Sequence, residues 1–198
     1  MMRDVADSAA STVSPVPGAE PRSPGHVDSP NPPRSVLLDT NVLLDHLMRR
    51  DGRAGHATAM LKACIRHDVT LQCASTSLKD IAYISAAALR RELSSREALS
   101  PDSLLETATM RELLHRIPWQ CVEQVRALCG IVAVDRETCD RAIALRDRHD
   151  DFEDDLIVAA AQRSGSAYVV TSDRQLISHF PGYCITPSRL TALLDEDR

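Results

Sequence analysis

The sequence predicts an α/β protein in which a mostly parallel β-sheet of four to five strands is covered by helices on both faces. Short apolar runs alternate with segments whose apolar residues recur at helical spacing, which is typical of β-α-β units. The runs are almost uniformly apolar, as expected for strands buried on both faces. With 198 residues, 43% of them hydrophobic, the chain can bury a sizeable core in one domain.

The first 34 residues differ in composition from the rest of the chain. They hold seven of the 11 prolines, many serines and no periodic apolar pattern. Such a segment cannot bury enough apolar surface to offset the entropy lost on ordering. We therefore expect a disordered tail over 1–34 and one folded domain over 35–198.

The first half of that domain alternates between predicted strands and helices. Residues 35–38 form an apolar run that ends at a polar Asp-Thr-Asn, which is typical of a buried strand entering a loop. Apolar residues then recur at helical spacing over 42–48 and 54–67. Residues 69–73 are predicted to be a second strand. A helix follows from Ser75 or Ser77 to about residue 92.

The middle section, about 93–129, is predicted to be helical. We expect two helices, 102–116 and 119–129, because Pro118 lacks the N–H that an uninterrupted helix uses. The section is longer than a crossover between two strands needs. We therefore expect it to form a helical arm or lid, and its leucines offer an apolar surface for a partner.

The second half returns to alternation. Strands are predicted over 131–134 and 167–170, with a fifth strand over 183–185. Residues 137–148 and 152–163 are predicted to be helices between them. A closing helix begins at Pro187, since proline is favoured in the first turn of a helix.

Composition excludes several classes of protein. No apolar run approaches the roughly 20 residues of a transmembrane helix, and no secretory signal is evident, so we expect a cytoplasmic protein with no membrane partner. The six cysteines form no Cys-x-x-Cys pair and no zinc spacing, which favours reduced thiols. A net charge of −5 gives no support to a broad basic surface for nucleic acid.

Two aspartates follow predicted strands, where ligands bind in open parallel sheets. Asp39 follows the strand at 35–38, and Asp173 follows the strand at 167–170. Aspartate also ends strands and caps helices, so a purely structural role is the alternative for each residue.

Two further acidic candidates stand at predicted helix starts. Residues 150–155 hold five acids directly before an almost uniformly apolar helix, so at least one carboxylate is expected to point inward. The alternative is that these acids only complement the helix dipole. Asp80 follows the second strand, and a capping box with Ser77 is its alternative role.

A hard cation would bring such acids together. Two carboxylates about 5 Å apart repel by about 3 kcal/mol at an effective dielectric constant near 20. Mg²⁺ or Mn²⁺ offsets this repulsion, takes oxygen ligands and can activate a water for attack on phosphorus.

Four short motifs resemble those of the PIN-domain ribonucleases, including toxins of the VapC kind. They are Val-Leu-Leu-Asp-Thr-Asn-Val at 36–42, Asp-Phe-Glu-Asp at 151–154, Val-Val-Thr-Ser-Asp at 169–173 and Ile-Thr-Pro-Ser at 185–188. Their order matches the family, and together they span roughly 35–195. The resemblance implies a compact three-layer α/β/α sandwich and a nuclease site that binds Mg²⁺ or Mn²⁺.

Carried over by position, the resemblance assigns metal-binding and catalytic roles to four acids: Asp39, Asp80, Asp154 and Asp173. It assigns supporting roles to Asn41 and Thr171, and Glu153 is the second choice for the position of Asp154. The chain departs from the family where Asp80 replaces the more usual Glu and where Asp155 replaces a small apolar residue. The implied partners are an RNA substrate, an antitoxin protein and a second copy of the chain.

Two rival hypotheses stay open. The first is a catalytically inactive PIN-like module that binds RNA or protein. The second is a phosphoacceptor domain that uses Asp39, but neither of the two lysines, Lys62 and Lys79, follows a late strand. We expect the aromatic residues Tyr83, Trp119 and Phe152 to pack in the interior rather than to stack on nucleic-acid bases.

Overall fold

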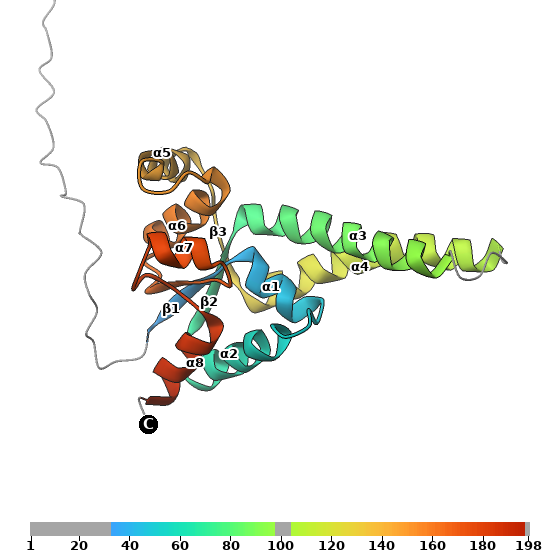
Figure 1. Ribbon diagram of the computed structural model, residues 1–198, viewed down its shortest axis with the longest axis horizontal. Coiled ribbons are helices and arrows are strands. Elements are labelled where there is room, and N and C mark those ends of the chain that lie inside the picture. The colour runs from blue at the N-terminus through green and yellow to red at the C-terminus, as the bar shows by residue number, and fades with distance from the viewer. Residues whose placement is uncertain (1–32, 98–103, 197–198) are drawn as a thin grey trace, which may run out of the picture.

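A computed structural model describes residues 33–97 and 104–196 (Figure 1). A five-stranded parallel sheet has the strand order β3-β2-β1-β4-β5. The strands are β1 (Ser35–Leu38), β2 (Thr70–Ala74), β3 (Gly130–Val132), β4 (Tyr168–Val170) and β5 (Cys184–Ile185). The predicted parallel α/β fold with a fifth strand is therefore confirmed.

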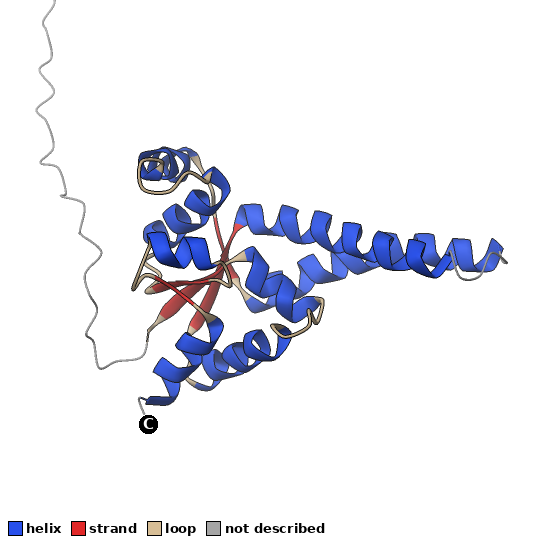
Figure 2. Ribbon diagram, in the orientation of Figure 1, coloured by secondary structure: helices blue, strands red, loops and turns tan. Residues whose placement is uncertain are grey.

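Helices cover both faces of the sheet, which makes a three-layer α/β/α fold (Figure 2). Alternate residues of β1 show why: Val36 and Leu38 pack into one core, and Leu37 packs into the other. The first core contains α1 (Thr40–Leu47), α2 (Ala54–Arg66) and α8 (Pro187–Glu196). The second contains α6 (Phe152–Ser164) and α7 (Arg174–His179), and α5 (Arg136–Leu145) packs on the outside of α6.

A two-helix arm projects from the body of the molecule (Figure 1). Its helices are α3 (Ser75–Glu97) and α4 (Leu104–Leu128), which run side by side. The predicted interruption at Pro118 is wrong, because Pro118 lies inside α4. Packing along α3 offsets the hydrogen bond that the proline cannot make. The helical character predicted for about 93–129 is present over 104–128, but the arm pairs this one helix with α3, whose predicted end was near residue 92.

Three smaller findings concern where elements begin and a short helix that was not predicted. The helix α3 begins at Ser75, directly after β2, which decides between the two predicted starts. The six-residue α7 was not predicted, because its length is too short to show helical periodicity. The carbonyl of Arg34 accepts a hydrogen bond from the Thr70 amide, so order begins within the expected tail. The rest of the expected tail, 1–32, lies outside the described residues.

Two predicted absences can be compared with the described residues. All six cysteines lie among them and are free thiols. No helix among the described residues is long and apolar enough to cross a membrane.

Candidate active site

The carboxyl ends of β1 and β4 bring Asp39 and Asp173 to one edge of the sheet. Asp39 directly follows β1, and Asp173 follows β4 after two polar residues. The two strands are parallel neighbours, so their ends meet. The charge of Asp173 contributes to the raised pKa of Asp39, which shows that the two carboxylates are close.

The carboxylate of Asp39 is buried and held by two polar side chains. Its Oδ2 accepts hydrogen bonds from Asn41 Nδ2 at 2.6 Å and Thr171 Oγ1 at 2.7 Å. Asn41 Oδ1 in turn accepts from the Ser172 amide at 3.0 Å, and Thr171 Oγ1 accepts from the Asp173 amide at 2.9 Å. The β1 and β4 loops are therefore joined through the two residues for which a supporting role was predicted.

Burial changes the proton affinity of Asp39. Removal from water raises the pKa of this carboxyl to about 6, although the hydrogen bond from Thr171 opposes the rise. A buried carboxylate with few charge partners needs either a proton or a cation.

The acids at the start of α6 have four different roles. Asp151 caps the helix, with Oδ1 accepting from the amides of residues 153 and 154. Glu153 is mostly exposed, and Asp155 is buried with its Oδ1 3.0 Å from His149 Nδ1. Asp154 is 25% exposed. The expectation that helix-dipole effects alone do not explain these acids agrees with the structure.

Asp154 is electrostatically coupled to the acids of the sheet edge. Burial and then the negative charges of Asp39, Asp151 and Asp173 raise its pKa to about 7, while nearby His149 opposes the rise. We call Asp39, Asp154 and Asp173 the acidic group. Three residues far apart in the sequence thus contribute to one negative potential.

Asp80 has a different neighbourhood. Its Oδ1 lies 3.0 Å from Lys79 Nζ, and the same ammonium lies 4.0 Å from Glu153 Oε1. Asp80 is therefore linked to the start of α6 through a lysine. The capping-box alternative is wrong, because Ser77 lies within α3 and its hydroxyl accepts a hydrogen bond from Thr40 Oγ1 at 2.9 Å.

Sequence reasoning missed two buried polar residues beside the acidic group. Asp45 is 1% exposed, accepts a hydrogen bond from Ser172 Oγ and pairs with Arg50 at 3.5 Å. Its charge within the apolar stretch 42–48 was the available signal. His149 is 7% exposed, and its ring packs at a tilt against that of His179 and edge-on against that of Phe180. No sequence pattern predicts that His149 is buried.

The prediction that three aromatic residues pack in the interior is wrong. Tyr83 is 72% exposed, Trp119 is 63% exposed and Phe152 is 51% exposed. Their rings are therefore available to other molecules.

The chemistry of the acidic group fits a hard divalent cation. Within 33–97 and 104–196, no three Asp, Glu, His or Cys side chains are arranged to hold an ion by themselves. Mg²⁺ commonly keeps several waters and binds through one or two carboxylates, so it does not require such a closed set. An ion here would also compensate the charge that raises the pKa values of Asp39 and Asp154.

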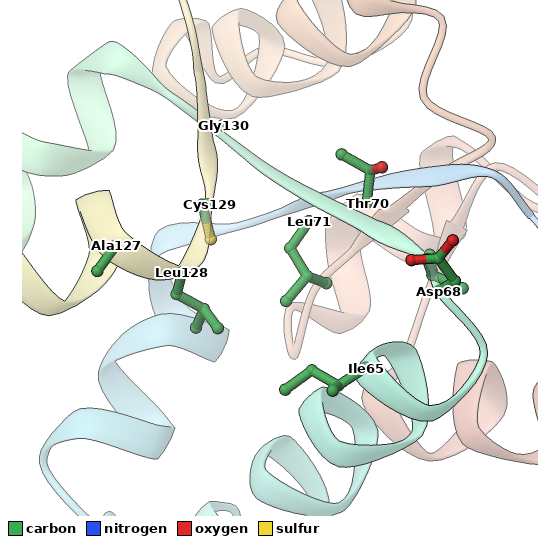
Figure 3. A pocket seen from close by; sticks show the side chains of 9 residues that line it. Ile65, Asp68, Thr70, Leu71, Ala127, Leu128, Cys129 and Gly130 are labelled. Carbon is green, nitrogen blue, oxygen red and sulfur yellow. The ribbon is translucent and has the colours of Figure 1, made fainter.

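A cavity of about 470 Å³ lies away from this edge (Figure 3). It is bordered by the amino-terminal residues of β2, by Gly130 of β3 and by the end of α4. Asp39 and Asp173 follow the carboxyl ends of their strands. The cavity therefore belongs to a different part of the molecule.

The fold is a three-layer, parallel α/β domain with an acidic edge, and the sequence pattern of the PIN domain matches residues 35–175. The chain therefore belongs to the PIN domain family, whose members are generally nucleases. No curated protein sequence matches the chain significantly.

Several solved structures are similar to the chain, and two of them are the following. One is described as a toxin-antitoxin complex from Klebsiella pneumoniae, with 19% identity, 77% of this chain and 97% of that chain covered, and a TM-score of 0.48. The other is PAE2754 from Pyrobaculum aerophilum, with 17% identity, 81% and 90% covered, and a TM-score of 0.48.

Proposed function

We propose that this protein is an endoribonuclease that depends on Mg²⁺ or Mn²⁺ and hydrolyses RNA phosphodiester bonds. The supporting observation is the electrostatic coupling of Asp39, Asp154 and Asp173 at the carboxyl edge of the sheet. Ligands of open parallel α/β sheets bind at the carboxyl ends of the strands, and the members of the PIN domain family, to which this chain belongs, are generally nucleases.

In this proposal the acidic group would hold the ion, with Asp80 as a further ligand. When bound, the ion supplies a more acidic water and stabilises charge on phosphoryl oxygens. The chain's own contribution is orientation: Asn41 and Thr171 fix one oxygen of Asp39, and α6 aims Asp154 at the same edge. Products with 5′-phosphate and 3′-hydroxyl ends are expected.

The test is cleavage of a mixed pool of single-stranded and transfer RNA, with Mn²⁺ and with a chelator. Asp154→Asn should abolish cleavage and leave the fold intact. Glu153→Gln is the matched control, because this neighbouring carboxylate is 71% exposed, and it should retain most of the activity. Full activity of Asp154→Asn, or cleavage in chelator, would contradict the proposal.

One observation favours the alternative of an inactive module that binds RNA or protein. Lys79 Nζ lies 3.0 Å from Asp80 Oδ1, so a cation of the chain itself already pairs with the second predicted acid. A calorimetric titration with Mn²⁺ separates the two functions. The nuclease must bind the ion, whereas an inactive module has no such requirement.

The remaining proposals on partners rest on the resemblance of the motifs. They are an antitoxin protein, a homodimer and a cytoplasmic location. Co-purification with the product of a neighbouring gene would test the first, and sedimentation of the purified protein would test the second.

A further inference from the structure

Two exposed aromatic rings lie on the elements that carry the acids. Phe152 is the first residue of α6 and stands two positions before Asp154. Tyr83 lies on α3 one turn after Lys79, and its proximity to that lysine shows in the raised lysine pKa. Both rings are open to solvent.

A contact between α3 and α6 places the two rings at the same region. Lys79 Nζ lies 4.0 Å from Glu153 Oε1, and Glu153 directly follows Phe152. Tyr83 therefore flanks this contact from α3, and Phe152 flanks it from α6. The acidic group includes Asp154, the next residue along α6.

The exposed face of α3 continues the same chemistry along the arm. Lys79, Tyr83 and Arg90 are spaced by four and seven residues, which places them on one face of a helix. All three are exposed, whereas Ile81 and Ser85 on the other face are buried. An ammonium, a ring and a guanidinium in a row suit a ligand with alternating phosphates and bases.

We propose that Tyr83 and Phe152 are base-stacking residues that bind unpaired nucleotides of an RNA strand on either side of the contact between Lys79 and Glu153. This inference rests on the proposed nuclease function and specifies its substrate as single-stranded. Bases within a duplex are stacked on one another and offer no free face to an aromatic ring. Lys79 would contact the phosphates between the stacked bases, and Arg90 would contact phosphates beyond Tyr83 along the arm.

The test is binding, not cleavage. The affinity of a fluorescein-labelled, unpaired RNA of about 12 nucleotides is measured by anisotropy in chelator and low salt. Tyr83→Ala and Phe152→Ala should each weaken binding about 5- to 100-fold, which is the usual effect of losing one stacked base. Tyr83→Phe keeps the ring and should bind like the wild type.

Two controls separate stacking from other effects. Ile65→Ala removes an exposed apolar side chain of α2 that borders the cavity away from the acidic edge, and should leave the affinity unchanged. An abasic oligomer of equal length keeps the phosphates but has no bases, so it should bind weakly and be insensitive to Tyr83→Ala. Because both side chains are exposed, the variants should melt at the temperature of the wild type.

The inference would be overturned if both alanine variants bound the RNA within twofold of the wild type, or if they lost as much affinity for the abasic oligomer as for the normal one. It would also be overturned if the wild type bound duplex RNA as tightly as single-stranded RNA, or bound no RNA in either chelator or Mn²⁺. The outcome is separable from that for nuclease activity. Binding that depends on Tyr83 without any cleavage would refute only the nuclease. Cleavage with an unchanged KM in Tyr83→Ala would refute only the stacking role.

Discussion

Replacing Asp154 by asparagine should stabilise the metal-free protein at pH 8. The pKa of this carboxyl is raised from 3.8 to about 7, which corresponds to about 4 kcal/mol of ionisation cost in the folded state. Because the side chain is 25% exposed and water screens part of its interactions, we expect roughly 2 kcal/mol. Asparagine has a similar shape and no charge, so it avoids this cost.

The sign of the effect follows from the two protonation states. Below about pH 4 the carboxyl is protonated in both folded and unfolded chains, and the variant should equal the wild type. Between about pH 4 and pH 7 the folded state holds its proton while the unfolded state releases it, so wild-type stability falls as the pH rises. The advantage of Asp154→Asn should therefore grow across that window and then level.

Urea unfolding at several pH values measures this difference. With an m value of about 2 kcal/mol per molar, the midpoint should rise by about 1 M at pH 8. Mn²⁺ at about 100 times its dissociation constant should stabilise the wild type by about 2.7 kcal/mol and reverse the order of the two proteins.

Glu153→Gln changes an exposed carboxylate one residue away. Its urea midpoint should equal that of the wild type, both without metal and with Mn²⁺. A variant less stable than the wild type in metal-free buffer at pH 8, or an order unaffected by Mn²⁺, would refute the reasoning.

Three further outcomes are expected. Thr171→Val removes a donor to the buried Asp39 Oδ2, so it should raise the pKa of Asp39 above 6 and cost about 1–3 kcal/mol at pH 8 in urea unfolding. His149→Phe keeps a ring beside Phe180 but removes the hydrogen-bond partner of the buried Asp155, so the free energy of unfolding should fall by about 1–3 kcal/mol. Adding Asp155→Leu should recover part of that free energy. The affinity for Mn²⁺, measured by calorimetry, should rise with pH until about pH 7 and then stay constant, because the ion binds Asp39 and Asp154 only when they are deprotonated. Equal affinities at pH 5.5 and pH 8 would exclude these two residues as ligands.

The layered fold was predictable because its signal is local. Residues 35–38 are a strand in both the prediction and the structure, since the short apolar run 36–38 between polar residues is typical of a buried strand. Pro118 misled the prediction, because the packing that keeps α4 continuous comes from a different helix. The short α7 depends on the Asp173 cap rather than on apolar periodicity.

The site was predictable to the extent that strand ends locate it. Asp39 and Asp173 follow strands, so their meeting at one edge could be anticipated. The separate roles of Glu153, Asp154 and Asp155 could not, because they depend on how α6 is rotated against the sheet. The burial of His149 depends likewise on contacts with residues about 30 positions away.

Because β2 passes directly into α3, we expect the arm to rotate as a rigid rod about Ser75, its fulcrum. No loop absorbs motion at this junction, and α3 has 23 residues, or about 35 Å of length. A tilt of about 5° at the root moves the far end by about 3 Å and moves Asp80, about 7 Å from the fulcrum, by only about 0.6 Å. A molecule bound to the outer arm would therefore move the Lys79–Asp80 pair about five times less than it moves the far end of α3. A force applied far from the acids would shift the residues beside them by a small distance.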